Sequence, residues 1–333
     1  MTMAHLDGCV PIRVHADRGR PMVDWCHMGH ARFGEPFFNE TVERRLRDPF
    51  ALLFRHQTPL DDLLELRRTS PGVPPAGFIF HMSRCGSTVI TQMLAASVEN
   101  VVLSEPEPVE GLLRARLFTR GIPDETWIAW LQALISAMAR PRLGPERRCF
   151  VKFDAWQTLD LPLIRSAFPE VPWIFVHRHP VEVLASHRRS PAAQMIPGVF
   201  PSTLYGIEPA EVARISTDEY VARALRAICD AALGLLDDGG LPVAYSELPD
   251  AAWTSIAAHF GLSISEPDVD AMRQAARLDV KRPAHEFRDD TAAKQASAPA
   301  EVHETAERCA MQSWRRLEAA RGSGAGAVMV GTG

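Results

Sequence analysis

The sequence predicts an α/β fold, in which a doubly wound parallel sheet flanked by helices follows a mostly helical or irregular N-terminal extension. From residue 77 onward, short continuous apolar runs alternate with helical patterns, as buried parallel strands and their connecting helices do. Before that point, residues 1–75 are rich in proline, histidine and arginine, and they lead into the turn-forming stretch TSPGVPPAG. We therefore expect a main domain over residues 76–321, while the glycine-rich residues 322–333 are typical of a disordered tail.

The predicted elements follow one another in a regular order. Within the extension, helical patterns cover residues 43–54 and 60–68. Each predicted strand of the main domain is a short apolar run, and these lie at residues 77–82, 100–104, 149–153, 173–178 and 241–248. Helical patterns lie between and around them, at residues 88–97, 107–118, 124–139, 159–168, 180–189 and 217–236.

Composition limits the functional classes. Apolar residues make up 46% of the 333 residues and charged residues 23%, as in ordinary soluble globular proteins, and the net charge of -5 disfavours a general nucleic-acid surface. The six cysteines form no Cys-x-x-Cys pair, which favours reduced thiols and a cytoplasmic location. No apolar stretch reaches the length of about 18 residues that a membrane span needs, and residues 1–20 do not form a secretory signal.

The stretch FIFHMSRCGSTVI places a glycine-containing loop between a buried strand and a helix. The unpaired N–H groups and the positive dipole end at a helix N-terminus attract a phosphate or sulfate group. Gly86 would let the backbone approach such an anion, Ser87 and Thr88 would supply hydroxyl donors, and Arg84 and Cys85 complete the loop. A tight turn that Ser87 or Thr88 merely caps is the simpler alternative.

Two other kinds of anion-binding loop do not match. A nucleotide-binding loop would need Gly-x-x-x-x-Gly-Lys-Ser/Thr, and this loop has no lysine. A cysteine phosphatase would need an arginine six positions after Cys85, where Thr91 stands. Cys85 is therefore interpreted as a small residue that fills a buried position.

A second basic segment, VHRHPVEVLASHRRS, covers the end of the strand at 173–178 and the helix after it. Arg178 ends an apolar strand, where an arginine is poorly placed for packing. Ser186 lies on the following helix, and Arg188 and Arg189 are typical of a solvated helix face. Since ligands bind beyond the carboxyl ends of parallel strands, Arg84 and Arg178 could hold two anionic groups of one ligand at one edge.

These segments together resemble the sulfotransferase family, in its bacterial and protein-tyrosine branch. SRCGST resembles that family's 5′-phosphosulfate loop, and VHRHPVEVLASHRRS resembles its 3′-phosphate segment, with Arg178 and Ser186 at the matching spacing. The stretch that opens with Lys152, and VAYSEL followed by IAAHFGL, resemble two further segments in the same order. Cys85 replaces the usual serine, and His179 stands where aspartate or asparagine is common.

The resemblance implies a P-loop-like α/β domain that uses 3′-phosphoadenosine-5′-phosphosulfate (PAPS) as co-substrate, with no metal. The acceptor would be a hydroxyl of a small molecule, sugar, lipid or peptide, and residues 1–75 would form a lid or an acceptor-binding segment. A P-loop kinase-like phosphotransferase and a non-catalytic nucleotide-binding protein are the alternatives. The resemblance assigns donor binding to Arg84, Cys85, Gly86, Ser87, Thr88, Arg178 and Ser186, and a basic loop at 281–295 adds Lys294.

The transfer chemistry needs a base for the acceptor proton and a cation for the leaving oxygen. Lys152 matches the family lysine. Glu105 follows the strand at 100–104 and is the first candidate for the base, Asp154 is the second, and Glu107 is a weaker third. If neither of the first two acts, a nearby histidine such as His81 must be considered.

Two further features have a weaker signal. Cys26, His27 and His30 are three potential zinc ligands, but no fourth is positioned nearby, so no metal site is predicted. Residues 195–207 are apolar and aromatic, and they form either an acceptor-pocket loop or an ordinary packed loop.

Overall fold

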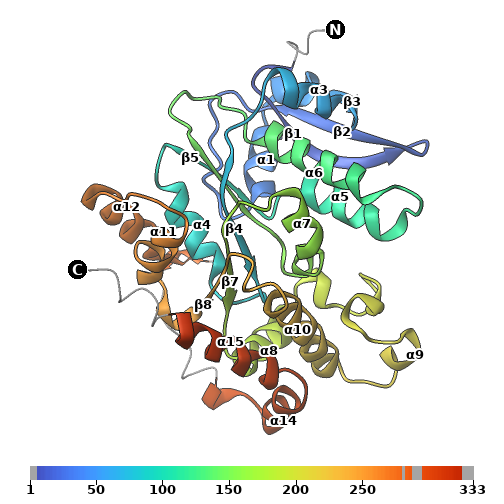
Figure 1. Ribbon diagram of the computed structural model, residues 1–333, viewed down its shortest axis with the longest axis vertical. Coiled ribbons are helices and arrows are strands. Elements are labelled where there is room, and N and C mark those ends of the chain that lie inside the picture. The colour runs from blue at the N-terminus through green and yellow to red at the C-terminus, as the bar shows by residue number, and fades with distance from the viewer. Residues whose placement is uncertain (1–5, 280–281, 287–294, 325–333) are drawn as a thin grey trace.

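The computed structural model describes residues 6–279, 282–286 and 295–324, and it confirms the predicted α/β fold class. A parallel sheet with strand order β5-β6-β4-β7-β8 runs through the middle of the main domain (Figure 1). All neighbouring strands in it pair in parallel, so each is joined to the next by a crossover connection. The strands are β4 (Pro75–His81), β5 (Asn100–Ser104), β6 (Arg148–Lys152), β7 (Trp173–His177) and β8 (Gly240–Ala244).

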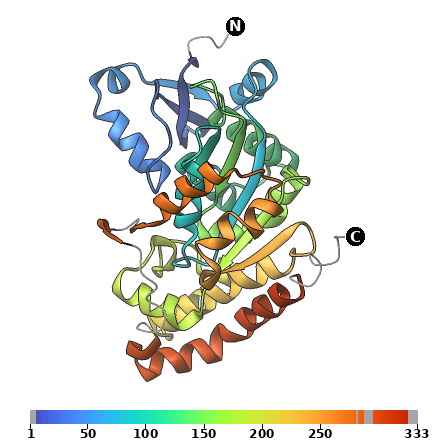
Figure 2. The same cartoon turned by 90° about the vertical axis from the view of Figure 1, so that its left-hand side faces the viewer.

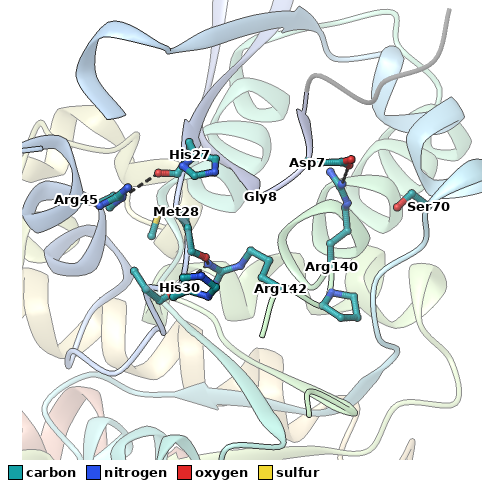
Figure 3. A pocket seen from close by; sticks show the side chains of 12 residues that line it. Asp7, Gly8, His27, Met28, His30, Arg45, Ser70, Arg140 and Arg142 are labelled. Atoms are coloured by element: carbon teal, nitrogen blue, oxygen red, sulfur yellow. Dashed lines mark hydrogen bonds and ion pairs between the residues drawn. The ribbon is translucent and has the colours of Figure 1, made fainter. Parts of the chain in front are cut away.

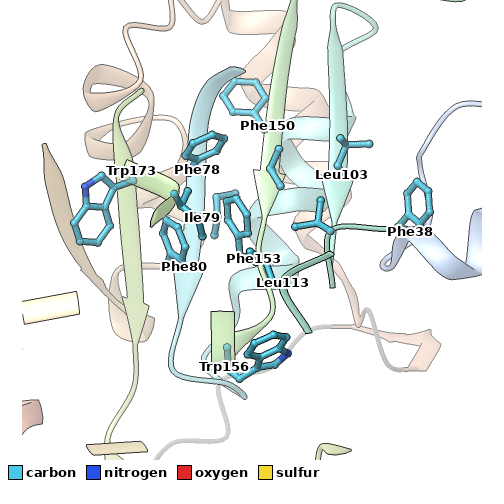
Figure 4. Packing of buried hydrophobic residues seen from close by; sticks show 14 of the residues in the cluster. Phe38, Phe78, Ile79, Phe80, Leu103, Leu113, Phe150, Phe153, Trp156 and Trp173 are labelled. Carbon is cyan, nitrogen blue, oxygen red and sulfur yellow. The ribbon is translucent and has the colours of Figure 1, made fainter. Parts of the chain in front are cut away.

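The sheet is packed on both faces, which is why its strands are continuous apolar runs. Figure 4 shows the aromatic side chains that fill the space around β4 and its neighbours. Phe80 stacks on Phe153 with ring centroids 4.8 Å apart, and Phe78 meets the edge of Phe153 at 5.2 Å. Phe80 also meets Trp173 of β7 edge-on at 5.7 Å, so β4 is held from both sides.

Helices cover the sheet in two layers, with α4, α11 and α12 on one side and α6, α7 and α10 on the other (Figure 1). The helices that the sequence predicts in the main domain all form close to their expected bounds. They are α4 (Ser87–Ala95), α5 (Glu107–Phe118), α6 (Asp124–Met138), α7 (Leu161–Ala167), α8 (Pro180–Arg189) and α10 (Thr217–Leu233). Further helices are α9 (Pro209–Val212), α11 (Ser255–His259), α12 (Glu266–Ala276), α14 (Ala300–Cys309) and α15 (Met311–Gly324), and a short pair β9 (Leu278–Asp279) and β10 (Arg282–Glu286) lies between them.

The N-terminal extension differs from the expectation of a mostly helical or irregular segment, because it contains a three-stranded antiparallel sheet in the order β1-β2-β3. Arg18 and Gly19 both have positive φ, 48° and 80°, which is the backbone of a tight two-residue hairpin loop. Pro11 and Pro21 interrupt the alternation that would have marked the two long strands. The elements are β1 (Cys9–Asp17), β2 (Arg20–His27), α1 (Phe38–Leu46), α2 (Pro49–Leu53), β3 (His56–Pro59) and α3 (Asp62–Thr69).

The extension packs against the main domain, at the end of the molecule opposite α14 and α15 (Figure 2). Gly111 marks one contact, since a Cβ there would lie 2.6 Å from the carbonyl oxygen of Val14, so only glycine lets α5 touch the backbone of β1. Ser104 donates its hydroxyl to the carbonyl of Pro36 at 2.8 Å, which ties the segment before α1 to the end of β5. The extension therefore reaches the carboxyl edge of the sheet.

The C-terminal end of the described chain is helical, and α15 includes residues 322–324 of the predicted tail, while 325–333 lie outside the described residues. In the part of the chain that the structure describes, no helix combines the length and the apolar character needed to cross a bilayer.

Candidate active site

The loop between β4 and α4 has an unusual backbone. Ser83, Arg84 and Gly86 have φ of 75°, 53° and 85°, and Gly86 precedes the first residue of α4. A left-handed conformation costs a non-glycine residue about 1–2 kcal/mol, and such strain persists mainly at functional positions. A turn of this kind points successive N–H groups inward and forms a concavity that binds anions. Strand, loop and helix are thus arranged as the sequence predicts.

Cys85 and Gly86 have structural roles inside this loop. The Cys85 thiol is buried and donates to the carbonyl of Val176 at 3.1 Å, which joins the loop to β7. Burial raises the pKa of Cys85 to about 11, so the group stays a thiol and is not a nucleophile. A Cβ on Gly86 would lie 2.8 Å from the ring of Tyr245, so this position requires glycine for space as well as for φ.

Lys152, Glu105 and Thr88 form a connected group where β5 and β6 end and α4 begins. Lys152 is fully buried, and its Nζ lies 2.9 Å from Glu105 Oε1 and 3.0 Å from Thr88 Oγ1. The ring of Phe37, from the extension, lies 5.0 Å from the same ammonium group. Lys152, Glu105 and Thr88 are separate candidates in the sequence, and the structure brings them together. The contact with Phe37 was not predicted.

Glu105 is held as a carboxylate. Burial by itself would raise its pKa, but the charge of Lys152 and the neighbouring His81 outweigh burial and lower the pKa to about 2. Its backbone is strained, with φ of 50°, and its N–H donates to the carbonyl of Lys152 at 2.7 Å. The side chain is thus fixed in place beside the lysine.

His81, at the end of β4, fixes Glu105 from the other side. Its Nδ1 accepts from the backbone N–H of Ser83 at 3.0 Å, so in the neutral ring the proton is on Nε2, which lies 3.3 Å from Glu105 Oε1. Burial lowers the pKa of His81, which keeps the ring neutral near pH 7. The neutral ring therefore directs its Nε2 proton toward Glu105 and does not compete with it as a base.

Asp154 lies close by but serves the local backbone. Its Oδ1 accepts from the N–H of Ala155 at 2.5 Å, at the start of the 3₁₀ helix η2 (Ala155–Asp160), and from Gln194 Nε2 at 2.7 Å. Burial, followed by the charge of Glu105, raises its pKa. Of the two candidate bases, Glu105 contacts the lysine, whereas Asp154 caps a helix and anchors Gln194.

Arg178 is buried at the end of β7, as predicted, and two side chains fix its guanidinium group. Its Nε donates to Glu182, one helical turn further on, and its plane lies over the ring of Tyr245, 3.8 Å from the centroid. Glu182 is itself buried and also accepts from Gln295 Nε2 at 2.7 Å. The Glu182 carboxylate, which was not predicted as a site residue, balances the charge of Arg178.

The two predicted anion segments meet at the carboxyl edge of the sheet. Arg84 Nη2 donates to the carbonyl of Ser190, after α8, at 2.6 Å. The backbone N–H of Arg178 contacts Met82 Sδ at 3.1 Å, and Tyr245 lies between Gly86 and Arg178. The strand that follows β4 in the chain is β5, on one side of the sheet, and the strand that follows β7 is β8, on the other side. The neighbouring strands β4 and β7 therefore lie where the connections run in opposite directions, which is where ligands bind in doubly wound sheets.

The remaining candidate positions lie around this edge or outside the described residues. Ser186 lies half-buried on α8, four residues after Glu182, and Lys294 lies outside the described residues. Across 6–279, 282–286 and 295–324, no group of three or more His, Cys, Asp or Glu side chains could hold a metal ion, and this includes the Cys26 and His27 region. The loop at 195–207 is tied to the site, since Tyr205 donates to the carbonyl of Gln194 at 3.0 Å.

Tyr245 and Ser190 are site residues to which the sequence analysis gave no role. Tyr245 stood inside the VAYSEL pattern, and its place directly after a buried strand was the signal that could have found it. Ser190 carried no such signal, because it follows the end of a helix and enters the site through its backbone carbonyl.

Comparison with known proteins gives distant likenesses. No family model matches the chain, and no curated protein matches it significantly. Among solved structures, it is similar to a sulfotransferase domain from the curacin biosynthetic pathway, with 15% identity, TM-score 0.45, and coverage of 71% of this chain and 98% of that one. It is also similar to a sulfotransferase from Alicyclobacillus acidocaldarius, with 13% identity, TM-score 0.45, and coverage of 75% and 96%. A retinol dehydratase in complex with retinol and PAP shows 14% identity, TM-score 0.34, and coverage of 78% and 86%. These likenesses are too distant to assign a function.

Proposed function

We propose that the protein is a sulfotransferase that moves the sulfuryl group of PAPS to a hydroxyl acceptor. The observation that carries this proposal is the buried Lys152, which bonds both to Thr88 of the anion loop and to Glu105. Sulfuryl transfer needs an anion cradle, a cation at the leaving oxygen and a base for the acceptor proton. These three parts lie in contact at one edge of the sheet.

The donor would bind along the two anion segments. The N–H groups of the strained loop and the hydroxyls of Ser87 and Thr88 would hold the 5′-phosphosulfate. Arg178 and Ser186 would hold the 3′-phosphate, and Glu182 fixes the plane of the guanidinium for that contact. Lys294 is proposed to close over the donor from the loop at 281–295.

Lys152 and Glu105 would act in turn. In the structure the lysine holds the pKa of Glu105 low, so the carboxylate is a weak base. We propose that Lys152 turns to the bridging oxygen when the donor is bound, which frees Glu105 and raises its pKa. Glu105 then accepts the acceptor proton as the acceptor oxygen attacks sulfur and the bond from sulfur to the phosphate oxygen breaks. Lys152 stabilises the charge on the leaving oxygen, and His81 keeps Glu105 oriented.

The acceptor would enter between the extension and the loop at 195–207. Phe37 lies against Lys152, and Gln194 joins this loop to Asp154, so apolar and aromatic groups border the reacting atoms. An apolar portion of the acceptor would pack there, whether it belongs to a small molecule, sugar, lipid or peptide. We also propose a cytoplasmic location, which the six free cysteines support.

Ligand-dependent melting separates this proposal from a kinase. Adenosine 3′,5′-bisphosphate should stabilise the protein by about 2.7 kcal/mol at 100-fold over its dissociation constant, a rise of several degrees in melting temperature. ADP lacks the 3′-phosphate and should do much less. Equal shifts with both ligands, or a shift with Mg-ATP alone, would favour a phosphotransferase.

A screen of hydroxyl acceptors with radiolabelled PAPS then tests turnover. Labelled product that requires Glu105 and Lys152 supports the proposal. Tight binding of the bisphosphate with no product from any acceptor class would identify a binding protein and not an enzyme.

A further inference from the structure

We propose that a cavity between the N-terminal extension and the end of α6 binds a small molecule that carries a phosphate group. The cavity has a volume of about 870 Å³, within the range of small-molecule sites and larger than a bare phosphate needs. None of its lining residues belongs to the loop at 82–88 or to α8, so this site is separate from the proposed active site. The lining consists of Asp7, Gly8, His27, Met28, Gly29, His30, Ala31, Arg45, Ser70, Arg140, Pro141 and Arg142.

Three guanidinium groups reach this cavity from separate parts of the chain. Arg45 comes from the last turn of α1, and Arg140 and Arg142 follow α6. Figure 3 shows Arg45 with His27 on one side of the cavity, Arg140 with Asp7 and Ser70 on the other, and Arg142 between them. Cations that converge from several elements are the usual recognition device for phosphate.

Backbone carbonyls hold each of these guanidinium groups in place. Arg45 Nε donates to the carbonyl of His27 at 3.0 Å. Arg142 Nη1 donates to the carbonyl of Ala31 at 2.8 Å, and Arg140 Nη1 to that of Leu6 at 3.1 Å. A carbonyl fixes the direction of a guanidinium without cancelling its charge, so the donors are oriented before any ligand arrives.

The carboxylates near these arginines are weak competitors. Asp7 pairs with Arg140, and Asp48 with Arg45, but the side chains of Asp7 and Asp48 are 78% and 40% exposed, so water screens both pairs. Glu146, four residues after Arg142, is bound to the backbone N–H groups of residues 142–144. Among the described residues, Arg142 has no carboxylate within 4.0 Å, although its guanidinium is partly buried over the ring of Phe33 at 5.1 Å.

The other lining residues are suited to contact the part of a ligand that lies beyond its phosphate group. The hydroxyl of Ser70 and the imidazoles of His27 and His30 add hydrogen-bonding groups, while Met28 and Pro141 add apolar surface. The alternative is that the arginines only clamp the extension to the main domain. The two roles differ in one measurable respect, which is saturable binding of a phosphate anion.

The test is calorimetric titration of inorganic pyrophosphate into the full chain saturated with adenosine 3′,5′-bisphosphate, so that the proposed donor site is already occupied. We expect saturable binding, and we expect Arg142→Gln to weaken it by about 10-fold or more, the effect of losing one charge-assisted contact. Arg147→Gln is the matched control, because Arg147 is an exposed arginine that lies outside the lining and close to Glu99, 3.8 Å away. It should leave pyrophosphate affinity unchanged.

A second pair of variants keeps the test decisive if Arg142→Gln fails to fold. Ser70→Asp places a negative charge in the lining and should weaken binding, while Ser70→Asn, of similar size and neutral, should not. Equal affinity in the Asp and Asn variants, equal affinity in Arg142→Gln and Arg147→Gln, or no saturable binding would each overturn the proposal. In those cases the arginines only clamp the extension.

Discussion

Lys152 and Arg178 lie buried beside carboxylates, whereas the guanidinium groups around the extension cavity are held by backbone carbonyls. At the carboxyl edge of the sheet, Glu105 and Glu182 each contact a cation directly. At the extension, Asp7 and Asp48 meet their arginines from solvent-exposed positions. A buried carboxylate beside a buried cation offsets its charge directly, whereas an exposed carboxylate is screened by water and leaves more of the arginine's charge for a ligand.

Glu105 and Glu107, two positions apart in the chain, differ in the direction in which their pKa values are shifted. Glu105 is paired with Lys152, and its pKa is lowered to about 2. Glu107 lines a smaller cavity of about 370 Å³ beside Val14 of the extension, and its Oε2 is buried without a hydrogen-bond partner among the described residues. Burial raises the pKa of Glu107 to about 7. A neighbouring cation thus stabilises Glu105 as a carboxylate, whereas burial favours the protonated form of Glu107.

We expect the largest effect on the transfer rate from removing the carboxylate of Glu105, which is paired with Lys152. Glu105→Gln keeps the shape of the side chain but removes its basicity, so transfer should fall by about 10²–10⁴-fold, the usual contribution of a general base. Binding of adenosine 3′,5′-bisphosphate should persist, because the loop and Arg178 are unchanged. Single-turnover transfer measures the rate, and calorimetry measures binding.

Asp154→Asn is the matched control for that variant, since it removes a second partly buried carboxylate from the same region. It should cost much less, because Asp154 caps η2 and anchors Gln194. Near-normal transfer by Glu105→Gln together with an inactive Asp154→Asn would assign the base to Asp154.

Removing the ammonium group of Lys152 should have the next largest effect on turnover. Lys152→Met keeps most of the apolar stem and removes the ammonium group, and turnover should fall about 10²–10³-fold, the scale for one lost charge-stabilising donor. Glu105 would lose its main partner, so burial should raise its pKa and shift the pH–rate profile upward. Unchanged turnover would remove Lys152 from the proposed chemistry.

Arg178→Ala tests the other paired cation. The 3′-phosphate does not react, so the affinity for adenosine 3′,5′-bisphosphate should fall by about 10-fold or more while saturated turnover changes less. Arg189→Ala, on the exposed end of α8, is the control and should bind normally. A large loss of saturated turnover without a loss of affinity would reverse the assigned roles of Arg178 and Lys152.

The smallest expected effect is on the stability of the protein, and it comes from replacing Glu107. The folded protein keeps a proton on Glu107 up to about pH 7, while the unfolded chain releases it near the ordinary value of 4.5. Stability therefore falls as pH rises through this window, and Glu107→Gln should restore on the order of 1–2 kcal/mol at pH 8 and almost nothing at pH 4. Urea denaturation at the two pH values measures the difference.

Glu105→Gln should show the opposite sign in the same experiment. The lowered pKa of Glu105 contributes stability above about pH 4.5 that is lost as pH falls toward 2, so this variant should be destabilised at pH 8. Identical pH dependence of the two variants would mean that pairing does not distinguish these regions.

The sheet and its helices could be predicted from the sequence because a strand covered on both faces must be apolar throughout. The apolar run CFV, for example, lies between Arg148 and Lys152 and forms β6 as expected. The hairpin of the extension could not be predicted in the same way. One face of β1 is partly exposed and Pro11 lies within it, so its apolar residues form neither a continuous run nor a clean alternation.

The same difference applies to the candidate site, where residues next to buried strands could be predicted and residues from other segments could not. Arg84, Lys152 and Glu105 were predictable because each follows or ends a buried strand, and parallel strands end at one edge. Phe37 and Gln295 were not, because they reach the site from segments outside the sheet whose paths depend on tertiary packing. The pairing of Arg178 with Glu182 was visible in principle, since the two stand four residues apart at the start of one helix.

The burial of every cysteine has a practical consequence. A maleimide can react with a thiol only in molecules that have opened around it, so labelling rates measure the local free energy of opening. Cys9 and Cys26 lie on the paired strands β1 and β2, Cys85 lies in the loop before α4, and Cys149 lies in β6. Peptide-resolved labelling of the unmodified chain would therefore time the detachment of the extension, the loosening of the loop and the rupture of the sheet as separate events.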